Sequence, residues 1–155
     1  MDNLNNTILI VDDDERMLRA LAKTLRSEGA QVITTQGAGD AVGIISRLKT
    51  SVDLVITDLR MPHITGVALL GFIRMTAPDL PVIVLTAFGS PEMMAECLRQ
   101  GAAAFLEKNL TSAQLLAEVQ HVLAVRKRNQ EPPVADTSWK NAATDEIVES
   151  KNCDE

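Results

Sequence analysis

The sequence predicts an α/β protein in which one parallel sheet is covered by helices on both faces. Residues 8–11 and 82–85 are unbroken runs of aliphatic side chains, which is typical of strands buried on both faces. Each strand-like run is followed by a segment with apolar residues at helical spacing, and this alternation repeats five times. Strands that alternate with helices at short intervals are joined by right-handed crossovers, so they run parallel.

Length and composition suit one globular domain. The chain has 155 residues, of which 46% are hydrophobic, and two full domains would be hard to fit. No apolar run approaches the roughly 20 residues that cross a bilayer, and the N-terminus lacks the pattern of a signal peptide, so we expect a cytoplasmic protein. Cys97 and Cys153 form neither a disulfide framework nor a metal-ligand cluster, and we interpret them as unpaired thiols.

The net charge of -6 is concentrated at the C-terminal end of the chain. Residues 1–128 hold 14 acidic and 13 basic side chains, whereas residues 129–155 hold 7 acidic and 2 basic ones. A nearly neutral body with an acidic tail lacks the basic surface that binds nucleic acid. We therefore expect no direct nucleic-acid binding by this chain.

The first four predicted elements follow one another closely. The aliphatic run 8–11 is a buried strand, and a stripe of apolar residues over 17–25, with basic residues opposite, predicts a helix that ends at Gly29. Residues 31–35 form a weaker strand pattern. The apolar stripe over 41–48 indicates the second helix.

The next elements surround the central acidic residue of the chain. Residues 53–57 predict the third strand, and Asp58 follows it directly, before a proline that ends the strand. After Gly66, apolar residues over 67–73 indicate the third helix, and the run 82–85 is the fourth strand.

The last elements have clear boundaries. Ser90 is a predicted N-cap for a fourth helix that begins at Pro91 and runs to Gly101, because proline is favoured at the first helical position. Residues 103–106 form a short fifth strand. Thr111 or Ser112 is the predicted cap of a fifth helix that ends in the basic cluster 126–128. We interpret the polar, acidic residues 129–155 as a linker or disordered tail.

Polar side chains stand at the carboxyl ends of four predicted strands, at one edge of the sheet. They are two acids after the first strand, one after the third, a threonine at the end of the fourth and a lysine after the fifth: Asp12, Asp13, Asp58, Thr86 and Lys108. Three crowded carboxylates repel one another unless a cation compensates, and oxygen ligands without His or Cys suit Mg²⁺. The hydroxyl and the lysine ammonium fit a site that also holds a phosphoryl group.

These motifs resemble the receiver (CheY-like) domain of two-component response regulators. The resemblance covers about residues 6–128 and rests on the acidic pair Asp12 and Asp13, Asp58 in DLVITDLRMPHITG, Thr86 in VIVLTAFG, and Phe105 and Lys108 in AAAFLEK. It implies a flavodoxin-like, doubly wound (βα)5 fold with strand order 2-1-3-4-5.

The resemblance also implies a role for each site residue. Asp58 would be the phosphoacceptor, which takes its phosphoryl group from a histidine kinase or a phosphotransfer protein. Mg²⁺ would be bound by Asp13, by Asp58 and by the backbone carbonyl of Arg60, with Asp12 holding a metal-bound water. Lys108 would neutralise charge on the phosphoryl group.

A conformational switch is part of the same implication. Thr86 would hydrogen-bond a phosphoryl oxygen and move inward, and Phe105 would rotate into the space left behind. The surface made by the fourth helix, fifth strand and fifth helix would then change shape and control a downstream protein or an output domain. A phosphorylation-dependent homodimer through the fourth and fifth helices would be compatible with this switch.

Two alternatives stay open from the sequence. The chain could be the N-terminal receiver of a longer transcription factor or output enzyme. It could also be a Mg²⁺-dependent phosphatase with an aspartate nucleophile, but that class places a general acid two residues after the nucleophile, where this chain has Arg60. We therefore favour a signalling module without enzymatic turnover.

The chain departs from the family pattern in two places. Asn109 stands where the family has a proline after a cis bond, so we predict either a trans bond with a rearranged loop or a strained cis bond. The second departure concerns Arg60 and Phe88, which the family pattern would place near the path of the hydrolytic water, and we predict that Phe88 shields the acyl phosphate. We interpret Asp14 as a cap of the first helix and His63 as an exposed loop residue.

Overall fold

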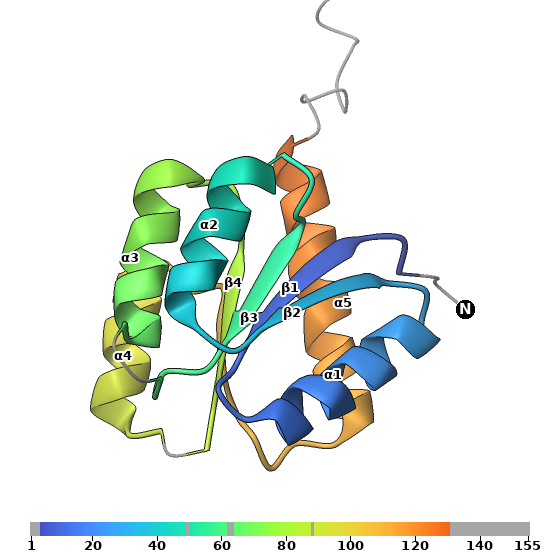
Figure 1. The fold of residues 1–155 in the computed structure, drawn as a ribbon, viewed down its shortest axis with the longest axis horizontal. Helices are drawn as coiled ribbons and strands as arrows, with labels where there is room; N and C mark the ends of the chain where they lie inside the picture. The colour runs from blue at the N-terminus through green and yellow to red at the C-terminus, as the bar shows by residue number, and fades with distance from the viewer. Residues whose placement is uncertain (1–3, 49, 62–63, 88, 131–155) are drawn as a thin grey trace, which may run out of the picture.

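Five parallel strands form one sheet in the order β2-β1-β3-β4-β5, which confirms the predicted topology (Figure 1). The computed structural model describes residues 4–48, 50–61, 64–87 and 89–130. The strands are β1 (Thr7–Val11), β2 (Gln31–Thr35), β3 (Leu54–Thr57), β4 (Val82–Thr86) and β5 (Ala104–Glu107). Val11 is paired with Thr35 on one side and Thr57 on the other, so the carboxyl ends of these strands lie level at one edge.

Helices cover both faces of the sheet (Figure 1). They are α1 (Glu15–Ser27), α2 (Ala38–Leu48), α3 (Gly66–Thr76), α4 (Pro91–Arg99) and α5 (Ser112–Gln130). One core cluster joins α2, α3 and α4 to the sheet, and a second joins α1 and α5 to the opposite face. The strands β3 and β4 contribute side chains to both clusters, which explains why their sequences are aliphatic throughout.

N-cap residues explain where two of the helices begin. Asp14 caps α1 by accepting a hydrogen bond from the backbone N–H of Arg16, as predicted. Ser90 caps α4 in the same manner through Met93 N–H, also as predicted. The helix α2 begins at Ala38, earlier than its apolar stripe indicates.

The fifth helix is longer than the sequence pattern predicts. Residues 129 and 130, which the sequence interpretation assigned to the tail, belong to α5. The sequence has no helix-breaking residue until Pro132, which disfavours helical conformation in the residue before it. The predicted tail from residue 131 onward lies outside the described residues. None of the described helices is long and apolar enough to cross a membrane.

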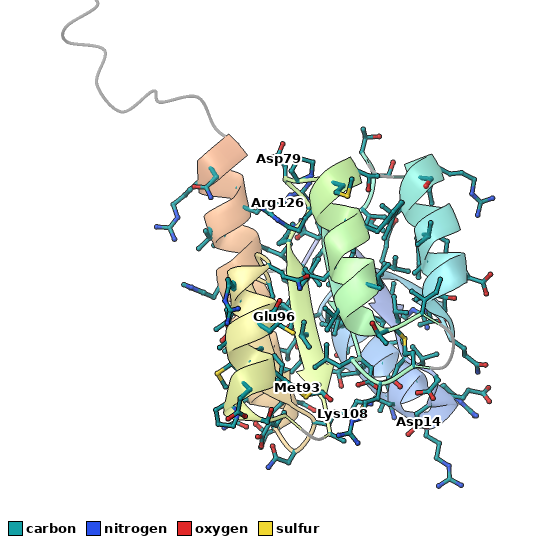
Figure 2. All side chains as sticks on the ribbon, turned by 90° about the vertical axis from the view of Figure 1, so that its left-hand side faces the viewer. Asp14, Asp79, Met93, Glu96, Lys108 and Arg126 are labelled. Carbon is teal, nitrogen blue, oxygen red and sulfur yellow. The ribbon has the colours of Figure 1, made fainter. Side chains whose placement is uncertain are left out.

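An ion pair holds the end of α5 at the edge of the sheet opposite Lys108 (Figure 2). The guanidinium Nη1 of Arg126 lies 2.8 Å from Oδ1 of Asp53 and donates to its carbonyl oxygen at 3.0 Å. The other carboxylate oxygen of Asp53 accepts from Thr7 N–H at 2.8 Å, where β1 begins. Asp53 therefore joins the starts of β1 and β3 to the last turns of α5.

Replacing Arg126 by methionine should lower the free energy of unfolding by about 2 kcal/mol, because a partly buried carboxylate loses its charged partner. The side chains of Arg126 and Asp53 are only 15% and 31% exposed. Urea denaturation followed by circular dichroism measures the change. The matched control is Arg99→Met, whose ion pair with Glu96 is far more exposed, and it should change stability by less than about 0.5 kcal/mol. Equal effects for the two variants would refute this role of Arg126.

Candidate functional site

Asp58 lies at the carboxyl end of β3, as predicted, and it is 7% exposed. Its backbone N–H donates to Val11 O at 3.0 Å, which ties the residue to the end of β1. The hydroxyl of Thr57 donates to Asp58 O at 3.0 Å. The backbone of Asp58 is therefore held from both sides, and its carboxylate has a defined position.

Gly66, at the start of α3, packs directly against this backbone. A Cβ atom at residue 66 would collide with the carbonyl oxygen of Asp58 and would lie 2.8 Å from Leu59 Cα. The N–H of Gly66 donates to Leu59 O at 3.0 Å, so the helix and the loop after β3 are in backbone contact. The sequence pattern predicts Gly66 only as the start of a helix. Its missing side chain matters through a contact with residues on the other side of the loop, which a local pattern does not show.

Asp12 and Asp13 follow β1 and differ in their exposure. Asp12 is 2% exposed, whereas Asp13 is exposed to solvent. Each of these residues and Asp58 offers a carboxylate oxygen, and the three oxygens lie within 4.8 Å of one another. The side chain of Asp14, the next acid along the chain, accepts a hydrogen bond from Arg16 N–H and caps α1. The structure therefore brings together the three carboxylates that the sequence predicts.

Lys108 enters this cluster from the end of β5. Its Nζ lies 2.6 Å from Oδ2 of Asp12 and 3.2 Å from Oδ2 of Asp58. Its backbone N–H donates to Thr86 O at 2.9 Å, which fixes the base of the side chain on β4. The peptide bond to Asn109 is trans, so Lys108 reaches Asp58 without the cis bond of the family pattern. Figure 2 shows Lys108 at the same end of the molecule as Asp14.

The charges of the cluster depend on one another. Burial raises the pKa of Asp12, and this effect exceeds the opposing hydrogen bond from Lys108. Burial alone would lower the pKa of Lys108, but hydrogen bonds and charge interactions with Asp12 and Asp58 outweigh it and raise that pKa. Lys108 is therefore protonated at neutral pH and stands as a fixed cation between two carboxylates.

Thr86 and Phe105 lie on the neighbouring strands β4 and β5. Thr86 ends β4 and is 1% exposed. Phe105 is half-buried and packs against the core cluster of α2, α3 and α4. Both residues occupy the places that the sequence predicts.

Some predicted features are not tested by these contacts. The N–H of Arg60 lies 3.4 Å from Oδ1 of Asp58, and the predicted role of its carbonyl oxygen stays a prediction. Phe88 and His63 lie outside the described residues, so the predicted shielding by Phe88 stays a prediction too.

The chain is similar to known proteins over most of its length. Residues 8–120 match the family model of the response regulator receiver domain. The transcriptional regulatory protein GlrR of Escherichia coli (strain K12) is 36% identical over 135 residues, which are 87% of this chain and 29% of that protein. The chain thus spans less than a third of the length of this curated relative.

Two solved structures are similar over most of the chain. A response regulator receiver domain protein from Clostridium thermocellum has a TM-score of 0.77 at 27% identity and covers 81% of this chain and 99% of its own. The complex of CheX with CheY, BeF3 and magnesium from Borrelia burgdorferi gives a TM-score of 0.73 at 30% identity, with 76% of this chain and 88% of that chain covered.

Proposed function

Because the chain belongs to the response regulator receiver domain family, we propose that Asp58 accepts a phosphoryl group from a phosphohistidine of a histidine kinase or phosphotransfer protein. A carboxylate oxygen of Asp58 attacks phosphorus and forms the new O–P bond. The N–P bond breaks, and its electron pair remains on the departing imidazole nitrogen. The product is an aspartyl phosphate.

The observation that carries this proposal is the position of Lys108 between Asp58 and Asp12. A carboxylate and a phosphoryl group are both anions and repel each other as they approach. A fixed cation at the nucleophile offsets this repulsion, which is the main task of a protein in phosphoryl transfer. The raised pKa of Lys108 keeps that cation in place at neutral pH.

A magnesium ion fits the donor set at this edge of the sheet. Three carboxylates within 4.8 Å offer hard oxygen ligands from Asp12, Asp13 and Asp58, and the carbonyl of Arg60 would complete the set. When bound, the ion supplies positive charge to the oxygens of the phosphoryl group. The similar CheY from Borrelia burgdorferi was solved with BeF3 and magnesium, which supports this assignment.

Replacing Lys108 by methionine should strengthen Mg²⁺ binding by about tenfold, because a positive charge that competes for Asp12 and Asp58 is removed. Calorimetric titration with MgCl₂ measures the change. Lys23→Met, which removes an exposed charge on α1, is the control and should leave the affinity within about twofold of the original. Weaker binding by Lys108→Met would contradict the charge competition.

Mg²⁺ affinity should fall on acidification at a higher pH than an ordinary carboxylate site would show. Protons and the metal compete for the same oxygens, and the raised pKa of Asp12 keeps a proton on it at a pH where an unperturbed aspartic acid, with a pKa of about 3.9, is ionised. Magnesium titrations over a pH series test this expectation. Asp12→Asn should move the acidic fall to lower pH without removing it, because Asp13 and Asp58 can still take up protons. A wild-type affinity that stays constant down to pH about 4 would contradict the expectation.

Thr86 and Phe105 are the proposed conformational link to the surface of the domain. In this proposal the hydroxyl of Thr86 binds a phosphoryl oxygen, and the ring of Phe105 changes position as Thr86 moves. The surface formed by α4, β5 and α5 then takes a second shape that a partner distinguishes. Thr86 on β4 is paired with Glu107 on β5, two residues along the strand from Phe105, and this proximity in space supports such coupling.

The proposed output is a downstream protein or a further domain. This chain matches only 29% of the length of GlrR, which supports a receiver that controls another part of a longer protein. The nearly balanced charge of residues 1–128 favours protein partners over direct contact with nucleic acid. Dimerisation through α4 and α5 stays a prediction.

Incubation with a small acyl phosphate, with and without Mg²⁺, tests the proposed function. We expect one phosphoryl group per chain by intact mass spectrometry, formed only with Mg²⁺ and lost slowly. Continuous rapid release of inorganic phosphate would instead support the alternative of an aspartate-nucleophile phosphatase. The absence of any adduct under both conditions would refute the proposal.

A further inference from the structure

Gly89 lies against the aromatic ring of Phe105. A Cβ atom at residue 89 would lie 2.6 Å from Cε1 and 2.9 Å from Cζ of this ring, both shorter than any ordinary carbon contact. The same Cβ would lie 3.5 Å from the methyl carbon of Thr86, an ordinary contact. The ring therefore occupies the space that a side chain at residue 89 would need.

The backbone of Gly89 does not itself require glycine. Two other glycines, Gly29 and Gly101, have positive φ angles of 95° and 99°, where other residues are strained. Gly89 has no such angle, so an alanine there would meet no backbone penalty. Only the ring of Phe105 excludes a side chain.

The position of Gly89 connects this contact to α4. The next residue, Ser90, is the N-cap of α4, and its carbonyl and hydroxyl oxygens accept from Met94 and Met93. Thr86 lies three residues earlier, at the end of β4. The ring of Phe105 thus lies against Gly89, the residue that precedes the N-cap of α4.

We propose that Gly89 is a positioning residue. Because Gly89 has no side chain, the ring of Phe105 can take its resting position, in contact with the backbone just before α4. This inference rests on the proposed switch, because the ring that Gly89 positions is the ring that moves in that switch. A side chain at residue 89 displaces the ring without any phosphoryl group on Asp58. Gly89 thereby determines how strongly the domain favours its resting conformation.

Fluorine NMR of the full chain labelled with fluorophenylalanine tests the inference. The chain has 3 phenylalanines, and the resonance of Phe105 is assigned by its loss in Phe105→Leu. In unphosphorylated Gly89→Ala we expect this resonance to move away from its position in the original protein. A resonance that keeps its original position in folded Gly89→Ala overturns the inference.

A matched glycine and a phosphorylated sample complete the experiment. Gly37→Ala adds a methyl group in a loop with no atom within 4 Å, and it should leave the Phe105 resonance in place. Addition of acyl phosphate and Mg²⁺ to the original protein tests the switch separately. If phosphorylation does not move the resonance but Gly89→Ala does, the proposed switch fails while the role of Gly89 stands.

Urea denaturation tests the inference even if Gly89→Ala folds poorly. If the cost of Gly89→Ala comes from the ring, the double variant Gly89→Ala with Phe105→Ala should unfold at the same urea concentration as Phe105→Ala alone. A double variant that loses as much stability as Gly89→Ala does in the original background overturns the inference.

Discussion

Asp58→Asn should abolish phosphorylation of the chain by a small acyl phosphate, whatever the Mg²⁺ concentration. The amide is nearly the same size as the carboxylate but has no anionic oxygen to attack phosphorus, so the loss should be complete rather than partial. Intact mass spectrometry after incubation with acyl phosphate and Mg²⁺ measures the adduct. The backbone contacts of Asp58 with Val11 and Thr57 do not involve the carboxylate, so the variant should fold.

Asp14→Asn is the matched control for this prediction. Asp14 lies close in sequence to the carboxylate cluster but caps α1 instead of joining it, and asparagine is an equally good N-cap. This variant should be phosphorylated like the original chain. An Asp58→Asn protein that still gains a phosphoryl group would show that another residue is the acceptor.

Gly66→Ala should damage both stability and the site. The added methyl group would collide with the carbonyl oxygen of Asp58 and crowd Leu59, and backbone atoms cannot yield as a flexible side chain can. We expect the free energy of unfolding to fall by about 3 kcal/mol, at the upper end of overpacking effects. Because α3 must move away from the loop that holds Asp58, phosphorylation of the remaining folded protein should slow at least about tenfold.

Gly71→Ala, in the same helix, gives the comparison. The nearest atom to an added Cβ is Gln100 Oε1 at 4.0 Å, so the methyl group fits. Alanine is the better helix former, and this variant should gain about 0.5–1 kcal/mol of stability. Urea denaturation and phosphorylation rates measured on both variants separate a local collision from a general effect of alanine. If the two variants behave alike, the contact of Gly66 with Asp58 does not position the site.

The fold could be predicted because its causes are local and repeated. The aliphatic runs of β1, β3 and β4 identify strands buried on both faces, and the N-caps Asp14 and Ser90 are short-range signals. The carboxylate cluster followed from the same logic, because parallel strands deliver their carboxyl ends to one edge. The sequence pattern did not predict which carboxylates of the cluster are buried and which are exposed to solvent. Asp12 and Asp13 are neighbours in the chain, yet one is buried and the other is not.

The sequence pattern did not predict the contacts between residues that are far apart in the chain. The basic cluster at 126–128 predicts a favourable helix end, but Arg126 instead forms an ion pair with Asp53, 73 residues away. The predicted partner of Lys108 was the phosphoryl group on Asp58, whereas the structure adds a shorter ion pair with Asp12. The roles of Gly66 and Gly89 are also invisible locally, because each depends on an atom of another element that fills the place of a side chain.

The central claim is that Asp58 is the residue that carries the phosphoryl group, and peptide mapping of the phosphorylated original chain tests it most directly. Borohydride reduction converts an aspartyl phosphate to homoserine, which marks the acceptor permanently. We predict that, after labelling with acyl phosphate and Mg²⁺, the mark lies at Asp58 in the tryptic peptide of residues 50–60 and is absent without Mg²⁺. A mark at Asp12 or Asp13, or a phosphoryl group that borohydride does not replace, would contradict the account.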